Sequence, residues 1–195
     1  MKQISTLLVL SILLIFQSCG EDKKPRSKDG QTDTVISGDN NITHQPVQSS
    51  KGLVLTINAD FQKNDELIVF WKDKSVGWFT DEKTIYGGSS DIEGHQSIEF
   101  KFPENAIPND LRIDVSNNKD QKEIKINFIK IKDENREFYV FGDEIKKYFK
   151  LNEFISLDEK NNTLYLSVKG DNYDPYLTTT HDFILELEKV LNTTF

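Results

Sequence analysis

The chain has little of several residue types on which many small proteins depend. It contains one cysteine and three histidines in 195 residues, so it cannot close an intrachain disulfide or build the usual Cys and His zinc site. Its 24 Lys and Arg are outnumbered by 32 Asp and Glu, which gives a net charge of -8. Such a chain lacks the broad basic surface that binds nucleic acid phosphates. Disulfide-stapled, zinc-finger and nucleic-acid-binding proteins are therefore excluded.

Motifs for cofactors and catalysis are also missing. Gly87 and Gly88 are not followed by the Lys-Ser/Thr pair of a phosphate-binding loop, and they indicate a turn. Ser89, Ser90, Asp91 and His95 supply the residue types of a hydrolase triad, but the Gly-x-Ser-x-Gly elbow is absent. We therefore expect no catalytic residue and no cofactor. A hydrolase stays a third possibility, to be revived if His95 lies within hydrogen-bond reach of Ser89 or Ser90.

The one long apolar run lies at the amino terminus. Residues 4–16 are apolar except for three hydroxyl residues, and Lys2 precedes them. The run is shorter than the roughly 20 residues of a membrane-spanning helix, and it has the form of a signal-peptide core. Ser18, Cys19 and Gly20 follow it closely.

Residues 1–20 resemble the lipoprotein signals of bacteria, in the variant typical of Bacteroidota. The resemblance implies removal of residues 1–18 and a diacylglyceryl group with palmitate-type chains on Cys19. Two acyl chains hold a protein firmly, since each buried methylene adds about 0.8 kcal/mol. Phe16 and Gln17 depart from the commonest pattern, and an ordinary cleaved signal or an uncleaved anchor is the alternative. The expected location is the cell envelope, lipid-anchored in the outer membrane on its periplasmic or surface face.

A polar segment separates this signal from the rest of the chain. Residues 20–51 hold four apolar side chains in 32 positions, too few to offset the entropy of ordering. We interpret residues 19–51 as a lipidated cysteine followed by a disordered tether, with a reach of about 30 Å. Asp33–Val35 resembles the acceptor for O-glycosylation in Bacteroidota, with Thr34 as the modified residue.

From Gly52 onward the sequence has the pattern of a mainly β protein. Eight segments alternate apolar and polar residues or form short apolar runs: 53–57, 67–71, 98–102, 111–115, 124–131, 138–141, 154–157 and 164–168. The doublet Phe128-Ile129 interrupts one alternation and indicates a β-bulge, and residues 160–162 indicate a hairpin turn. These features predict that residues 52–195 form an antiparallel β-sandwich.

Two short helices are expected beside the strands. The first covers Asp143–Phe149. The second is C-terminal, begins with a capping pair at Thr179 and Asp182, and carries one apolar stripe of Phe183, Ile184, Leu187, Val190 and Leu191. We expect this stripe to pack on the sandwich, with docking to another protein as the alternative.

Residues 53–132 resemble the extracytoplasmic jelly-roll domains of Bacteroidota envelope and glycosyltransferase-associated proteins, which are akin to carbohydrate-binding modules. The strings Pro108–Asn118 and Gln121–Ile126 carry this resemblance. It implies a jelly-roll-like fold and has little specificity for any activity.

Two kinds of candidate site remain. Oxygen ligands gather at Asp110, Asp114, Asn117, Asn118 and Asp120, and again at Asp171, Asn172 and Asp174. Neither cluster has EF-hand spacing, and the turn-forming habit of Asn and Asp explains both, so we assign no metal residue and leave calcium open. The other candidate is aromatic: Trp71 falls in phase with core positions, whereas Trp78 and Tyr86 stand among polar residues. Exposed rings of this kind stack against sugars, although packing within a loop is the simpler role.

The sequence thus predicts a membrane-anchored envelope lipoprotein whose non-catalytic sandwich binds a glycan or another envelope component through Trp78 and Tyr86. The alternative is an accessory or assembly protein that presents a sheet face to a protein partner. Exposed rings beside a groove favour the glycan, and a broad apolar patch on a sheet face favours the partner.

Overall fold

The structure is a computed structural model and describes residues 52–89 and 94–195. The predicted signal, Cys19, the tether with Thr34, and Ser90 and Asp91 lie outside these residues. In the described part of the chain, no helix is both long enough and apolar enough to cross a bilayer.

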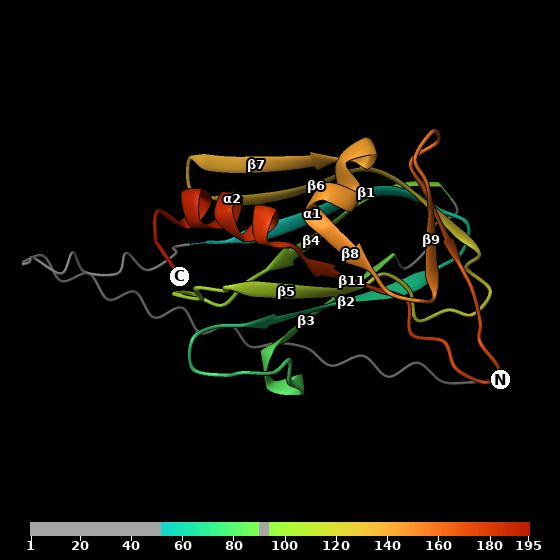
Figure 1. The fold of residues 1–195 in the computed structure, drawn as a ribbon, viewed down its shortest axis with the longest axis horizontal. Coiled ribbons are helices and arrows are strands. Elements are labelled where there is room, and N and C mark those ends of the chain that lie inside the picture. Colours follow the sequence, from blue (N-terminus) through green and yellow to red (C-terminus); the bar gives the residue numbers. More distant parts are fainter. Residues whose placement is uncertain (1–51, 90–93) are drawn as a thin grey trace, which may run out of the picture. The chain divides into compact units, whose positions relative to one another are not determined.

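Two antiparallel sheets pack face to face as a β-sandwich (Figure 1). Sheet A has the order β4 (Gly94–Lys101), β1 (Val54–Phe61), β6 (Glu123–Asp133), β10 (Thr163–Leu166) and β9 (Ile155–Asp158), and β7 (Arg136–Phe141) also pairs with β6. Sheet B has the order β3 (Thr84–Ser89), β2 (Asp65–Lys72), β5 (Asp110–Asp114), β11 (Tyr176–Thr179) and β8 (Phe149–Leu151). The prediction of a mainly β sandwich is confirmed.

The core lies between the sheets and follows from the period-two alternation of the strands. Leu55, Ile57 and Phe100 of sheet A are buried, as are Val69 and Ile113 of sheet B. Strand β1 pairs with β4 on one side and with β6 on the other along its whole length. The next residues along each strand face outward, so each sheet also has an outer face.

The predicted bulge is present in β6. Asn58 of β1 pairs with Phe128, but the next residue, Ala59, pairs with Ile126. Asn127 is therefore the extra residue of the bulge. It allows Ile126 and Ile129 both to face the core, and each is 1% exposed.

The helices lie at one side of the sandwich, where α2 (His181–Leu191) contacts β6 and β7 of sheet A and β11 of sheet B (Figure 1). Its apolar stripe is buried, as predicted, except that Ile184 is half-buried. The cap is Thr180, whose hydroxyl accepts from the Phe183 amide. The predicted cap, Thr179, instead ends β11. The predicted helix over 143–149 begins and ends one residue earlier and consists of a 3-10 turn, η2 (Gly142–Glu144), followed by α1 (Ile145–Tyr148). A further 3-10 turn, η1, covers Asp81–Lys83.

Strands β3, β8 and β11 were not expected from the sequence. Gly87 and Gly88 lie within β3 and do not form a turn. A Cβ on Gly87 would lie 2.6 Å from Cε1 of Phe100. This glycine therefore serves close packing of β3 on the core, which is a recurrent use of glycine inside strands.

Candidate functional site

The outer face of sheet B gathers aromatic and charged side chains from four adjacent strands. We call this surface the sheet B face, and its residues are Ile68, Phe70, Lys72, Thr84, Tyr86, Asp110, Arg112, Asp114, Tyr176 and Thr178. The strand register places Tyr86, Ile68, Asp114 and Tyr176 in one row across the sheet. Thr84, Phe70, Arg112 and Thr178 form the next row.

Arg112 lies at the centre of this face between two aromatic rings. Its Cζ is 3.9 Å from the centroid of the Tyr176 ring and 5.4 Å from that of Phe70. A guanidinium stacked in this way gains cation–π attraction and loses freedom to move. The side chain is 25% exposed, so part of it remains accessible from solvent.

Two carboxylates fix the orientation of Arg112. Its Nε and Nη2 donate to the two oxygens of Asp114 at 2.6 and 3.0 Å, and Nη2 also donates to Asp174 at 2.6 Å. Burial opposes the positive charge, but hydrogen bonding to Asp114 and the two nearby carboxylates raise the pKa of Arg112 above its usual value. The guanidinium is therefore a permanent, rigidly held donor group flanked by acceptors.

The two aromatic residues selected from the sequence are both exposed. Tyr86 is 60% exposed and lies at one end of the row that contains Asp114. Trp78 is 83% exposed and lies in the loop between β2 and η1. Among the described residues no ring contact joins the two. Trp71 is buried, as expected from its phase.

Phe79 and Lys72 continue the sheet B face toward the loop that carries Trp78. The Nζ of Lys72 lies 4.9 Å from the centroid of the Phe79 ring and 2.9 Å from Oδ2 of Asp110. Phe79 thus packs beside the outward side chains of sheet B. Trp78, the residue before Phe79 in the chain, is not part of the core.

The outer face of sheet A has an aromatic cluster of its own. Phe128 and Tyr139 meet edge to face with centroids 5.4 Å apart, and Tyr139 stacks on Phe141 at 5.9 Å. Phe141 is 52% exposed. We call Phe128, Tyr139 and Phe141 the sheet A aromatic cluster.

Beside this cluster lies a groove of about 350 Å³, whose walls include Val54, Thr56, Glu99, Lys130 and Lys132. The Thr56 hydroxyl is buried at its base and has no hydrogen-bond partner among the described residues. A buried hydroxyl without a partner is energetically unfavourable.

His95 also lies on sheet A, with both ring nitrogens engaged. Its Nδ1 lies 3.0 Å from Oδ1 of Asp60, and its Nε2 lies 3.1 Å from Nδ2 of Asn58. Ser89 is in β3 of sheet B, and its side chain, like Ser90 and Asp91, lies outside the described structure. In the part of the chain that is described, no hydroxyl donates to His95.

The acidic loops have partners other than a metal. Asp110 pairs with Lys72, whereas Asp114 and Asp174 pair with Arg112. No cluster of three or more His, Cys, Asp or Glu among residues 52–89 and 94–195 is arranged to hold an ion. Asn117 and Asn118 belong to the loop between β5 and β6, and their amides donate to Asp65.

Asp65 organises the loop that connects β5 with β6. Its Oδ1 accepts from the backbone amides of Asn117 and Asn118 at 2.7 and 3.0 Å, and its Oδ2 accepts from the Ser116 hydroxyl. Ser116 in turn contacts the hydroxyl of Tyr173 at 2.7 Å. Burial raises the pKa of Asp65 above its usual value, although these hydrogen bonds oppose the shift.

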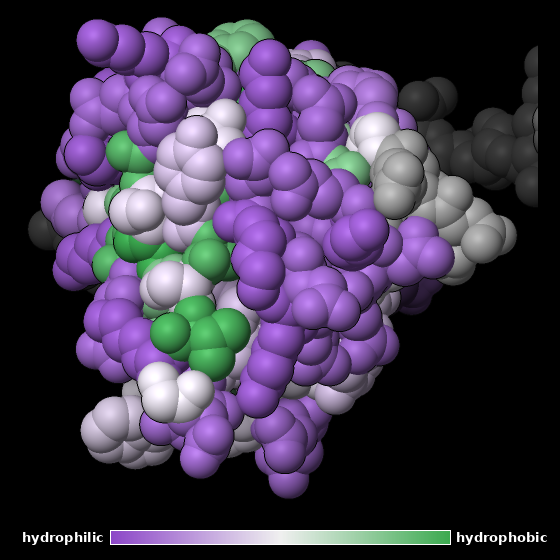
Figure 2. Space-filling view, turned by 90° about the vertical axis from the view of Figure 1, so that its right-hand side faces the viewer, coloured by the Kyte–Doolittle hydropathy of each residue, from purple (hydrophilic) through white to green (hydrophobic). Residues whose placement is uncertain are grey.

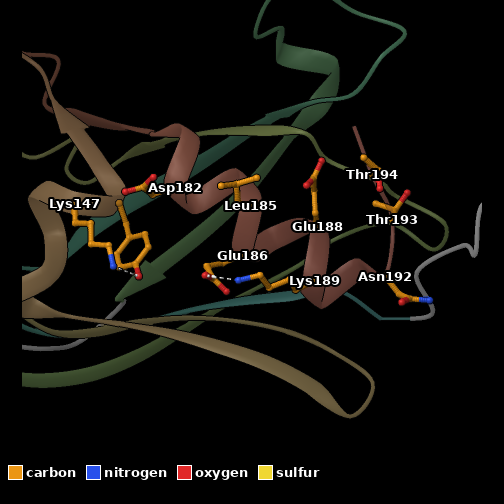
Figure 3. A pocket seen from close by; sticks show the side chains of 10 residues that line it. Lys147, Asp182, Leu185, Glu186, Glu188, Lys189, Asn192, Thr193 and Thr194 are labelled. Atoms are coloured by element: carbon orange, nitrogen blue, oxygen red, sulfur yellow. Dashed lines mark hydrogen bonds and ion pairs between the residues drawn. The ribbon is translucent and has the colours of Figure 1, made fainter.

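A hollow of about 600 Å³ follows the exposed side of α2 (Figure 3). Half of the residues that line it are charged, and several of these groups are already paired. Lys189 contacts Glu186 at 2.8 Å, and Lys147 donates to the Tyr148 hydroxyl at 2.8 Å. The hollow therefore offers less free binding chemistry than either sheet face.

The sequence identified Tyr86 but not Arg112, Tyr176 or Phe70, and it indicated Asp174 only as an oxygen ligand in a loop. The sequence could have identified Arg112 as an outward-facing residue, because it alternates with Leu111 and Ile113, which are buried. Compared with models of protein families, with curated proteins and with solved structures, the chain matches none.

Proposed function

We propose that the protein is a non-catalytic envelope lipoprotein that binds a glycan on its sheet B face. One arrangement carries this proposal: the exposed ring of Tyr86 shares a row with Asp114, which holds the stacked guanidinium of Arg112. A flat ring and a fixed set of donors and acceptors therefore lie on one open surface.

This chemistry suits a pyranose ring. The C–H face of a sugar packs against an aromatic ring, while its hydroxyls need both donors and acceptors. Arg112 supplies donors, and Asp114 and Asp174 supply acceptors. Because Tyr176 and Phe70 immobilise Arg112 before any ligand arrives, binding costs less side-chain entropy than it would on a flexible surface.

The proposal includes a membrane anchor at Cys19, which is supported by the resemblance of residues 1–20 to lipoprotein signals. The tether of residues 19–51 would separate the sandwich from the outer membrane. The proposal assigns no catalytic role to His95, whose ring nitrogens contact Asn58 and Asp60.

A protein partner is the second candidate, and the sheet A aromatic cluster favours it. Aromatic residues are enriched at protein interfaces, and Phe141 is half exposed on an edge strand. By contrast, hydrophilic side chains predominate on the end of the molecule shown in Figure 2, with the apolar ones in a band at one side. A partner would therefore bind the cluster in preference to that end.

The proposed function is tested with residues 44–195, a compact unit that contains the whole described core. This fragment is screened on a glycan array and titrated by tryptophan fluorescence and calorimetry. Tyr86→Ala should weaken glycan binding by about fivefold to tenfold, as expected for loss of one aromatic contact. Circular dichroism checks that the variant is folded.

Tyr165→Ala is the matched control, because Tyr165 is 44% exposed but lies on β10 of sheet A. It should leave glycan affinity unchanged. Trp78→Ala distinguishes a ligand that reaches the β2–η1 loop from one confined to the sheet B face. Failure of every glycan to bind, or equal losses in Tyr86→Ala and Tyr165→Ala, would contradict the proposal.

A further inference from the structure

We propose that the sheet B face binds an uncharged oligosaccharide chain that runs across the strands, and that it discriminates against both single sugars and acidic glycans. This inference rests on the proposed function. It adds the length, direction and charge of the ligand, and each follows from a different observation.

The length follows from the strand register. Tyr86 and Tyr176 end a row that crosses β3, β2, β5 and β11. Neighbouring strands are about 4.8 Å apart, so three spacings place the two tyrosine positions about 14 Å apart. A single pyranose is much shorter than this row. A chain of several sugars contacts Tyr86, Ile68 and the Asp114–Arg112 pair together.

The direction follows from the position of Tyr86. Strand β3 ends the order of sheet B, so the row runs out to an edge of the sheet at this point. Tyr86 is also the most exposed aromatic residue of the sheet B face. A sugar chain that stacks on it can continue past the edge. The site therefore fits an internal stretch of a glycan as well as its end.

The charge of the ligand follows from the ion pairs. Arg112 is paired with Asp114 and Asp174, and Lys72 with Asp110. Lys150 of β8 and Glu66 of β2 add one exposed charge of each sign to the same face, so carboxylates outnumber cations there. Asp174 is half exposed. A sugar carboxylate bound at Arg112 would lie close to these carboxylates, well within the screening length of about 8 Å at physiological salt. Hydroxyl groups meet no such repulsion.

Asp174 is therefore the residue that sets the charge preference. It reaches Arg112 from the loop between β10 and β11, and its removal would not break the bidentate pair between Arg112 and Asp114. Asp174→Asn should lower the discrimination against acidic oligosaccharides. Asp171→Asn is the matched control, since Asp171 lies in the same loop and has no described ion pair.

The experiment is calorimetric titration of residues 44–195 with oligosaccharides of increasing length. The probes are glucan, mannan, xylan and chitin oligosaccharides from monosaccharide to hexasaccharide, with oligogalacturonides of the same lengths as the acidic set. We expect affinity for one neutral series to rise at least tenfold from monosaccharide to tetrasaccharide and then to level off. Oligogalacturonides should bind at least tenfold more weakly, and this gap should narrow in Asp174→Asn but not in Asp171→Asn.

Equal affinity for a monosaccharide and its hexasaccharide would overturn the extended site, and the glycan function would stand. Acidic chains that bind as tightly as neutral ones would overturn the charge preference alone. If neither set binds, the proposed function fails together with this inference. A gain in Asp171→Asn equal to that in Asp174→Asn would remove the role given to Asp174.

Discussion

Asp65 stabilises the loop after β5 because one carboxylate accepts hydrogen bonds at both oxygens. Asp65→Ala removes the acceptor of two loop amides and the Ser116 hydroxyl in a site only 8% exposed. We expect the free energy of unfolding to fall by about 2–4 kcal/mol. Asp65→Asn keeps one oxygen for the amides and should cost clearly less. Urea unfolding of both variants measures the difference, and equal losses would contradict this account.

The same residue gives stability a pH dependence. Burial raises the pKa of Asp65 in the folded state above the unfolded value of 3.8. The folded protein therefore binds more protons in the range just above pH 3.8, and the contribution of Asp65 to stability falls as the pH rises through its folded pKa. In Asp65→Asn this decline should disappear from urea unfolding curves recorded across that range. An unchanged decline would assign it to other groups.

For a single residue, the sequence predicted burial only where the position of that residue in the strand alternation decides it. Trp71 falls with buried neighbours and is buried. The stack of Phe70, Arg112 and Tyr176 depends on the pairing of β2 with β5 and of β5 with β11. A local sequence pattern does not predict which distant segments pair as strands. The sequence therefore indicated Tyr86 and Asp114 as separate candidates and did not place them together on the sheet B face.

Strand β3 depends on a glycine for its fit against the core. In Gly87→Ala the new methyl group would meet the fully buried ring of Phe100 at 2.6 Å and Cγ2 of Ile98 at 2.9 Å. Overpacking of this kind costs about 1–3 kcal/mol. Gly88→Ala is the matched control, because the nearest neighbour of its new methyl group would be the Asp65 carbonyl oxygen at 3.5 Å. Thermal unfolding should separate the variants, and equal melting temperatures would contradict the packing role.

Every strand of eight or more residues was predicted, whereas three shorter strands were not. Strands β1, β2 and β6 have eight or more residues, which is enough for an alternation or an apolar run to be recognised. Strands β8 and β11 have three and four residues, and their neighbours in the sheets decide their conformation. For the helix α2, the sequence predicted the apolar stripe correctly but placed the N-terminal cap at Thr179, one residue before the actual cap, Thr180.

At the scale of the whole molecule, the fold class follows from the repeated alternation, whereas the functional face does not. Outward positions on sheet A and sheet B look alike in sequence, since both carry lysines, acids and aromatic residues. Only the pairing of strands shows that Tyr86 shares a row with Asp114, the residue that binds Arg112.

The lipid anchor makes a prediction for the entire chain. Cys19→Ser removes the sulfur that would carry the diacylglyceryl group, so the protein should leave the membrane fraction or keep its signal. Metabolic labelling with a palmitate analogue, cell fractionation and mass measurement detect either result. Ser18→Ala, which keeps a small residue before the cysteine, should be processed normally. Membrane retention and unchanged labelling of Cys19→Ser would rule out the anchor.

Strand β1 has a mechanical consequence. It is the first strand of the described chain, and both of its edges are paired along their full length. A force that is applied at the amino-terminal end and directed along the strand axis would load these hydrogen bonds together in shear. An edge strand peeled from its end would lose them one at a time. The sandwich should therefore resist unfolding when it is pulled from its amino-terminal end along β1.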